Sequence, residues 1–333
     1  MKIALISDAW HPQINGVVTT LSNTVKVLER LGHEVKPISP DLFMNFPCPG
    51  YPEVRLAFLC GSRLRPIIDS FNPDAIHIVT EGPVGFAARR YCKERGYSYT
   101  TSYLTQFPDY LNMRIGFPVS ISAGFLRWFH ADSAHVMVAT TTLEQDLSKK
   151  GYQRLARWSR GVNPELFKPR DKNFIKDPRP ILMYMGRVAI EKNIEAFLKL
   201  ELPGTKYVVG DGPHKEFLES KYPNVRFTGY QQGENLARYM AAADVFVFPS
   251  QTDTFGVVLL EALACGVPVA AFPVPGPMDV ITDPRVGILN EDLHYAIMTA
   301  LTLNPTDCLR YASEYTWEKC SQQFLENLVP KIS

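Results

Sequence analysis

Residues 244–272 read DVFVFPSQTDTFGVVLLEALACGVPVAAF, and this stretch contains a complete strand–helix–strand pattern. The apolar run 244–249 predicts a buried strand, and a polar loop follows it. Residues from about 254 to 265 predict a helix, because a glycine and a proline end the apolar pattern just before the next strand, 267–272. A strand, a helix and a second strand in this order indicate a parallel α/β sheet.

The same alternation extends over the rest of the chain. Five further apolar runs rich in β-branched residues predict buried strands, at residues 2–7, 75–79, 135–140, 181–186 and 206–210. After the first of them, Val17, Leu21, Val25, Leu28 and Leu31 lie on one face of a predicted helix, which Gly32 ends. The fold class is therefore α/β, with doubly wound parallel sheets.

Prolines separate two halves of this pattern. They cluster between residues 164 and 180, and a new strand opens at residue 181 much as the first opens at residue 2. We therefore expect two Rossmann-like domains facing across a cleft, residues 1–160 and 161–310, with 311–333 as a terminal segment. Ligands of such sheets bind beyond the carboxyl ends of the strands.

Composition excludes several classes of protein. The chain has 333 residues, with 35 Lys and Arg against 34 Asp and Glu, so its net charge of +1 argues against a nucleic-acid binder. No apolar run is long enough to cross a bilayer, and residues 1–8 do not resemble a signal peptide, so we expect a cytoplasmic protein. The 6 cysteines show no metal-binding or disulfide spacing.

The helix predicted at 254–265 carries the most informative acid. Glu261 lies among apolar residues on every side, and a buried carboxylate is costly unless it is hydrogen-bonded. Its partner would be ligand hydroxyls, such as a ribose diol, or an internal backbone or arginine group. Asp253 precedes the helix as a sugar ligand or a simple cap, and the amides of Thr254, Phe255 and Gly256 would face an anion.

Two further loops follow predicted strands. The sequence GRVAIEKN, residues 186–193, places Arg187 and Lys192 near one point, as a diphosphate site or as a solvated helix start. In the loop after the first strand, Gly16 opens a helix, so the backbone there can approach an anion. The chain has no dinucleotide fingerprint, no phosphate-binding P-loop and no Asp-x-Asp triplet, so a metal-bound diphosphate is not indicated.

Together these motifs resemble the family-4 retaining glycosyltransferases of the GT-B fold. The matching elements are PQ-x-NGV at 12–17, GR-x-x-x-EKN at 186–193, GDGP at 210–213, and the acidic pair Asp253 and Glu261 eight residues apart. They occur in the expected order. TDTFG at 252–256 and PVPGP at 273–277 resemble a bacterial branch of GDP-mannose-dependent α-mannosyltransferases.

The resemblance implies a nucleotide-sugar site and a set of roles. The implied donor-binding residues are Gly16, Arg187, Lys192, Gly229, Asp253, Thr254, Phe255, Gly256 and Glu261. Arg187 and Lys192 would bind the diphosphate and stabilise the leaving group without a metal, and Asp253 would hold hydroxyls of the sugar. Those three are the implied catalytic residues. Glu261 would bind the ribose, Gly16 would approach the diphosphate from the other domain, and the segment at Gly229 would flank the base.

The chain departs from the family pattern in the loop on the sugar side. A family histidine is replaced by Leu104, two residues before Gln106, and leucine can neither hydrogen-bond nor transfer protons. We expect an altered donor or acceptor preference, with a catalytically silent nucleotide-sugar binder as the alternative. Asp253 replaces the usual glutamate, and this shorter acid is expected to keep its contact. No cofactor is expected beyond the co-substrate, GDP-mannose or a UDP-sugar.

The acceptor is expected to be a lipid or a lipopolysaccharide-type glycan. Residues 107–129 are rich in aromatic side chains and residues 55–95 in arginine, which suits docking on the anionic inner face of the cell membrane or, alternatively, ordinary core packing and a solvated basic face. The resemblance also implies that residues 311–333 form a helix that crosses back to the first domain. A nucleotide-sugar epimerase and a two-lobed solute-binding protein are the competing interpretations.

Overall fold

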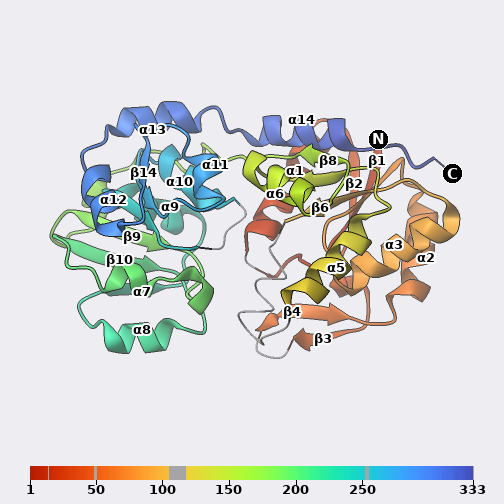
Figure 1. Cartoon of the computed structure of the whole chain (residues 1–333), viewed down its shortest axis with the longest axis horizontal. Coiled ribbons are helices and arrows are strands. Elements are labelled where there is room, and N and C mark those ends of the chain that lie inside the picture. Colours follow the sequence, from red (N-terminus) through yellow and green to blue (C-terminus); the bar gives the residue numbers. More distant parts are fainter. Residues whose placement is uncertain (14, 49–50, 105–117, 252–254, 333) are drawn as a thin grey trace. The chain divides into compact units, whose positions relative to one another are not determined.

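The computed structural model describes residues 1–13, 15–48, 51–104, 118–251 and 255–332, and it divides into two compact units. Unit 1 consists of Met1–Arg160 together with Trp317–Ser333, and unit 2 consists of Gly161–Thr316. The chain thus leaves unit 1 once, forms the whole of unit 2, and returns to unit 1 for its last helix (Figure 1).

Unit 1 contains a six-stranded sheet in the order β2-β1-β5-β6-β7-β8, in which every pair of neighbours is parallel. A separate antiparallel hairpin joins β3 to β4. The elements are β1 (Lys2–Ile6), α1 (Gly16–Arg30), β2 (Glu34–Ile38), the short helix η1 (Pro40–Leu42), β3 (Asn45–Cys48), β4 (Tyr51–Ala57), α2 (Cys60–Phe71), β5 (Ala75–Ile78), α3 (Pro83–Arg95), β6 (Thr100–Tyr103), α5 (Val119–His130), β7 (Val136–Val138), α6 (Thr141–Lys149), β8 (Leu155–Arg157) and α14 (Trp317–Asn327).

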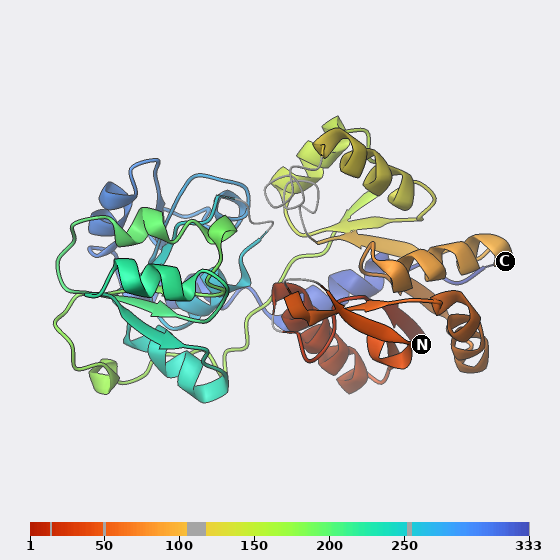
Figure 2. The same ribbon diagram turned by 90° about the horizontal axis from the view of Figure 1, so that it is seen from below.

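Helices cover both faces of this sheet (Figure 2). On one face, Ile76 and Ile78 of β5 pack with Leu64 of α2 and Val84 of α3 in a single apolar cluster. On the other face, the His77 ring contacts Phe324 of α14, with ring centroids 4.9 Å apart. Alternate residues of one strand therefore face opposite helix layers, as the period of two along a β-strand requires.

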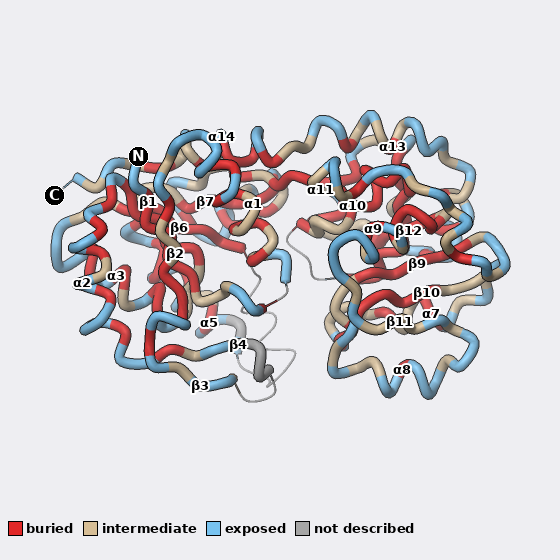
Figure 3. The backbone as a smooth tube through the Cα atoms, turned by 180° about the vertical axis from the view of Figure 1, so that it is seen from behind, coloured by how far each residue is buried: buried red, intermediate tan, exposed pale blue. Residues whose placement is uncertain are grey.

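Unit 2 repeats this plan, with a parallel sheet in the order β11-β10-β9-β12-β13-β14. Figure 3 shows its strands largely in red, as buried, whereas α8 is mainly exposed. The elements are η2 (Lys172–Phe174), β9 (Ile181–Met185), η3 (Ile190–Lys192), α7 (Glu195–Leu198), β10 (Thr205–Val209), α8 (Lys215–Lys221), β11 (Arg226–Gly229), α9 (Gly233–Ala242), β12 (Val245–Phe248), α10 (Val257–Ala264), β13 (Val269–Ala271), α11 (Pro277–Val280), β14 (Gly287–Leu289), α12 (Leu293–Ala300) and α13 (Pro305–Ala312).

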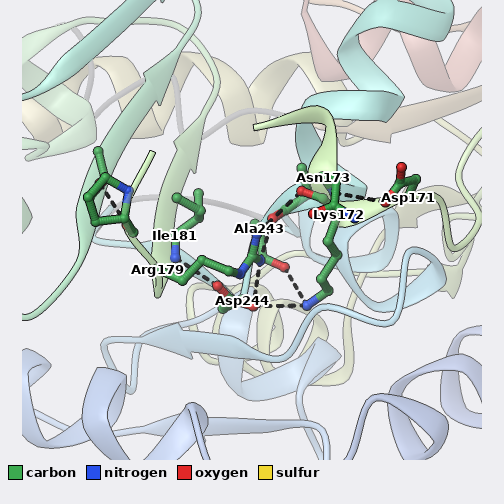
Figure 4. A network of polar contacts seen from close by, with 10 residues as sticks. Asp171, Lys172, Asn173, Arg179, Ile181, Ala243 and Asp244 are labelled. Atoms are coloured by element: carbon green, nitrogen blue, oxygen red, sulfur yellow. Dashed lines mark hydrogen bonds and ion pairs between the residues drawn. The ribbon is translucent and has the colours of Figure 1, made fainter. Parts of the chain in front are cut away.

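A charged cluster fastens the proline-rich segment to the amino edge of this second sheet (Figure 4). Asp244, just before β12, accepts hydrogen bonds from Lys172 Nζ at 3.0 Å, from Arg179 Nη2 at 2.7 Å and from the Ile181 amide at 2.7 Å. Burial opposes ionisation of Asp244, but these bonds outweigh it and hold its pKa below the usual 3.8. The cluster lies at the edge of the sheet opposite to the strand ends at which ligands bind.

The predicted fold class is confirmed. The seven strands predicted from the sequence coincide with β1, β5, β7, β9, β10, β12 and β13. The predicted helix at 254–265 is shorter at its start. Helix α10 begins at Val257, because its N-cap residue Gly256 has a left-handed backbone with φ of +82° and therefore cannot belong to the helix.

Candidate functional site

The order of strands in unit 2 marks the position of a ligand site. The chain runs outward from β9 to β10 and β11, and then starts again on the other side of β9 with β12. The loops that follow β9 and β12 therefore separate at the carboxyl ends of adjacent strands, the place where parallel α/β sheets bind ligands. A hydrogen bond of 3.1 Å from Asn193 Nδ2 to the Pro249 carbonyl oxygen joins these two loops.

Close packing of backbone fixes the loop after β9. A Cβ atom on Gly210 would lie 1.9 Å from the Gly186 carbonyl oxygen, and one on Gly212 would lie 2.3 Å from that of Val188. Only glycine fits at either position, so the loops after β9 and β10 run in direct contact. The Val188 amide donates to the Asp211 carbonyl at 2.8 Å, so a hydrogen bond also joins the two loops beside Arg187.

Arg187 follows β9 by two residues, and Lys192 is the last residue of the short helix η3. Both side chains are half-buried. The Arg187 carbonyl accepts a hydrogen bond of 2.8 Å from the Tyr184 hydroxyl. Both cations thus belong to the segment that follows β9 at the carboxyl edge of the sheet.

Glu261 is the most unusual acid of unit 2. It lies in α10, half-buried, and burial alone raises the pKa of its carboxyl from 4.5 to about 7. No residue that the structure describes forms a hydrogen bond or an ion pair with this carboxylate. The internal partner allowed by the sequence is therefore not found in the described part of the chain. The carboxylate keeps some exposure to solvent, and it is the predicted ribose ligand of the sequence analysis.

The loop before α10 is described only in part. Asp253 and Thr254 lie outside the described residues, so nothing structural is added to their predicted contacts. Phe255 is buried, and Gly256 accepts the hydrogen bond of the Leu259 amide at 2.9 Å. Because α10 begins at Val257, the predicted amides of Phe255 and Gly256 precede the helix instead of forming its first turn.

Gly229 ends β11, two strands away from Arg187 on the same sheet. Its backbone is left-handed, with φ of +69°, and its carbonyl accepts a hydrogen bond of 3.0 Å from the Gly210 amide. The next residue, Tyr230, is exposed. The structure therefore assembles Arg187, Lys192, Gly229 and Glu261 within one unit, with the first three at the carboxyl edge of the sheet.

Gly16 lies in unit 1, at the start of α1 and after the loop that follows β1. Asn15 caps this helix by accepting a hydrogen bond of 3.0 Å from the Val18 amide. A Cβ atom on Gly16 would have no atom within 4 Å, so packing within the unit does not require glycine there. Asn15 takes the Val18 amide, so the amides of α1 that an anion would meet are those of Gly16 and Val17.

The loop after β1 also contains a residue whose task sequence reasoning missed. Asp8 accepts hydrogen bonds from the Val84 amide at 2.8 Å, from the Gly85 amide at 3.2 Å and from the Thr80 hydroxyl at 3.0 Å. It therefore caps helix α3 from a distant part of the chain. No sequence signal indicated this contact; in the structure it also excludes a side chain at Gly82, where a Cβ would lie 2.4 Å from Asp8 Cγ.

A second missed group lies beside Asp8. Oε1 of Glu81 and Nε2 of His130 lie 3.1 Å apart, at hydrogen-bonding distance. Leu104, which replaces the family histidine, directly follows β6. Its side chain is apolar and only 9% exposed. Gln106 lies outside the described residues. No sequence pattern linked Glu81 to His130, because 49 positions separate them.

The described residues contain neither a metal-binding group of side chains nor a helix that could span a membrane. Across the ranges that the structure describes, no three His, Cys, Asp or Glu side chains are grouped so that they would hold a metal ion. Within the same ranges, no helix combines the length and the apolar character that crossing a membrane demands.

Comparison with known proteins identifies the family. Residues 14–166 match the model of glycosyltransferase family 4, and residues 167–294 match that of the group 1 glycosyl transferases. This chain belongs to the group 1 glycosyltransferases of the family-4 type, and it is an enzyme with the GT-B fold.

Individual relatives agree with this assignment. A GDP-mannose-dependent alpha-mannosyltransferase of Mycobacterium tuberculosis is 29% identical, over 87% of this chain and 83% of that protein. An alpha-monoglucosyldiacylglycerol synthase of Acholeplasma laidlawii is 30% identical, over 81% of this chain and 79% of that protein. The solved sucrose-phosphate synthase of Thermosynechococcus elongatus shares the fold, with a TM-score of 0.81 at 20% identity over 98% of this chain and 97% of that one.

Proposed function

We propose that this enzyme transfers a hexose with retention of configuration from a nucleotide sugar, mannose from GDP-mannose, to a lipid or lipopolysaccharide-type acceptor. The observation that carries the proposal is the half-buried Glu261 carboxylate, which has no partner among the described residues and whose pKa is about 7. A ribose diol supplies two hydroxyl donors that match a carboxylate. The name of the mycobacterial relative supports GDP-mannose as the donor.

The reaction breaks the bond between the anomeric carbon and the diphosphate, and forms a bond from that carbon to an acceptor hydroxyl oxygen on the same face. The hydroxyl proton passes to the departing diphosphate oxygen. Negative charge develops on the departing diphosphate. Arg187 and Lys192 stabilise this charge from the loop after β9, and their fixed positions avoid reorganisation during the reaction. Asp253 holds hydroxyls of the sugar. The proposed catalytic residues are therefore Arg187, Lys192 and Asp253.

The remaining proposed contacts position the donor. Glu261 binds the ribose, and Gly229 flanks the base at the end of β11. The backbone at Phe255 and Gly256, with Thr254, meets oxygens of the sugar or the phosphates. Gly16 offers its helix amides to the diphosphate, and the open space around its missing Cβ supports this role. Two protein cations supply the charge that a metal would otherwise supply, so we propose that the reaction is metal-independent.

A UDP-sugar is the alternative donor. The name of the Acholeplasma relative supports a glucosyl group and a diacylglycerol acceptor as readily as mannose. The replacement of the family histidine by Leu104 keeps a second alternative open, a protein that binds the nucleotide sugar but does not transfer it. Leu104→His restores the missing side chain and is expected to raise turnover in that case.

We also propose that unit 1 docks on an anionic membrane surface, where a lipid acceptor resides. Helix α5 exposes Ile121, Phe125 and Trp128, and Phe86 of the neighbouring α3 lies 6.0 Å from Trp128, measured between ring centroids. Apolar side chains of this kind enter the interface of a bilayer, and nearby arginines such as Arg127 are attracted to anionic headgroups. This surface suits a cytoplasmic enzyme bound peripherally to the inner face of the membrane.

A donor screen tests the central proposal. Thermal unfolding is measured with GDP, UDP, ADP and their sugar conjugates, with EDTA present throughout. Ligand at about 100 times its Kd should stabilise the protein by roughly 2.7 kcal/mol. Transfer is then followed with radiolabelled donor and a total bacterial lipid extract, and the label should enter the lipid phase. A folded protein that no nucleotide stabilises contradicts the proposal, and donor conversion without acceptor indicates an epimerase.

A further inference from the structure

Unit 1 contains a mostly buried acid to which the proposed reaction gives no role. We propose that Glu81 binds a hydroxyl group of the acceptor, and that His130 is the positioning residue that holds its carboxylate in place. This inference rests on the proposed transfer reaction and adds a residue that determines how the acceptor is recognised.

The position of Glu81 in the sheet is the first argument. In unit 1 the chain passes from β1 outward to β2, and later starts again on the other side of β1 with β5. The loops after β1 and β5 thus separate at adjacent carboxyl ends, where such sheets bind ligands. The Asp8 amide donates to the Thr80 hydroxyl at 2.7 Å across this point, and Glu81 is the next residue.

The contacts of the carboxylate are the second argument. Oε1 of Glu81 pairs with His130 Nε2 at 3.1 Å, whereas Oε2 accepts no hydrogen bond from any residue that the structure describes. The Glu81 side chain is 15% exposed, and His130 is 1% exposed. The histidine is thus sealed inside the unit, and the carboxylate that it holds still reaches the surface with one unused oxygen.

The support of His130 is the third argument. Its Nδ1 lies 2.8 Å from the Thr101 hydroxyl, which donates to Ser133 Oγ at 3.1 Å, and Ser133 donates to the His130 carbonyl at 2.8 Å. All three of these residues are buried. A chain of satisfied hydrogen bonds therefore fixes the imidazole, and the imidazole fixes Glu81, as a binding residue requires.

A purely structural role explains Glu81 less well. The nearest structural task for an acid is to cap helix α3, but Asp8 already accepts the Val84 and Gly85 amides. A carboxylate with little solvent costs free energy, which a ligand hydroxyl offsets by donating to Oε2. The neighbouring strand β6 ends at Tyr103, and the next residue, Leu104, is apolar and buried, so the Leu104 side chain cannot hydrogen-bond a ligand there.

The test compares Glu81→Gln with Glu29→Gln, a matched change at an exposed position on α1. Transfer to a total bacterial lipid extract is measured at varied lipid, and donor binding is measured by thermal shift. We expect Glu81→Gln to lower kcat/KM for the acceptor about 10- to 100-fold, because a hydrogen bond to a charged group is lost. Donor Kd and melting temperature should stay within error of the wild type, and Glu29→Gln should change nothing.

Variants at His130 separate positioning from packing. His130→Gln keeps a donor toward Glu81 and should retain more acceptor kcat/KM than His130→Phe, whereas a packing role predicts losses that follow the melting temperature. An active wild type with unchanged acceptor kcat/KM in Glu81→Gln overturns the inference alone. Equal losses for donor and acceptor also overturn it. A wild type that transfers nothing to the lipids contradicts the proposed function itself.

Discussion

Replacing Glu261 by glutamine should make the enzyme more stable and worse at binding its donor. The folded chain keeps a proton on Glu261 up to about pH 7, whereas the unfolded chain releases it near 4.5. The free energy of unfolding therefore falls as the pH rises through this window. At about 1.36 kcal/mol per pH unit the loss approaches 3 kcal/mol by pH 8. Glu261→Gln removes it, so the variant should gain up to that amount at pH 8 and little at pH 5.

Donor binding should favour the ionised form of Glu261 over the protonated form. Ribose hydroxyls that donate to the carboxylate favour its ionised form, so binding should lower the pKa of Glu261 and release about half a proton near pH 7. Glu261→Gln should release none. It should also weaken donor binding about 10- to 100-fold, because hydrogen bonds to a charged group are replaced by bonds to a neutral amide.

Two measurements check this reasoning. Denaturant unfolding at pH 5 and pH 8 gives the stability difference, and titration calorimetry in phosphate and in Tris gives the protons released from the dependence of the binding heat on the buffer. Glu216→Gln, on the exposed face of α8, is the matched control and should equal the wild type in both assays. A Glu261→Gln variant with wild-type stability at pH 8, or with wild-type donor affinity, would refute the argument.

Three further predictions concern other parts of the chain. Arg187→Ala and Lys192→Ala should each lower kcat/KM for the donor roughly 100-fold or more, because each removes a cation from the proposed leaving group. Gly82→Ala should destabilise unit 1 by about 1–3 kcal/mol in thermal or denaturant unfolding, since the new Cβ would lie 2.4 Å from Asp8 Cγ. Asp244→Ala should lower the free energy of unfolding by about 2 kcal/mol at neutral pH. Its effect should fade as acid protonates the wild-type carboxylate below the usual 3.8, where the stabilisation is lost.

Each of these predictions has a control. Lys199→Ala removes an exposed cation from unit 2, and either site variant with wild-type kcat/KM would contradict the assignment. Gly124→Ala on α5 meets no atom within 4 Å and should be tolerated, so equal destabilisation by both glycine variants would argue against the clash. For Asp244, a stability difference from the wild type that persists unchanged at pH 2 would show that charge is not its cause.

Much of the fold followed from periodicity, and the failures have a physical reason. Strand β6 has the sequence TTSY and was not predicted as a regular strand, although its residues are buried. Its hydroxyl groups are satisfied by partners from other elements, since Thr100 and Ser102 lie 2.8 Å and 2.7 Å from the His77 ring nitrogens. A strand that buries polar groups in mutual pairs gives no apolar signal. Strand β2, at the edge of the sheet, was not predicted either, because it contains Pro37 and only part of it is buried.

The candidate site was predictable to the extent that it follows strand ends. Arg187 follows a predicted strand and Glu261 lies in a predicted buried helix, whereas Gly229 ends strand β11, which the sequence argument did not predict. The capping task of Asp8 and the pairing of Glu81 with His130 could not be predicted, because each joins residues that only the sheet order brings together. The spacing of these residues in the sequence does not indicate such contacts, which depend on the order of the strands in the sheet.

The return of the chain to unit 1 has a consequence for synthesis on the ribosome. Helix α14 covers the central sheet of unit 1 through Phe324, and Gln323 Oε1 accepts the Ser159 amide at 2.9 Å. The ribosome makes this helix only after the whole of unit 2. The nascent unit 1 therefore lacks the Phe324 contact of His77, although Trp158 is already in the chain, while unit 2 is complete once residue 316 emerges. Native packing of unit 1 therefore includes a step that follows the synthesis of unit 2.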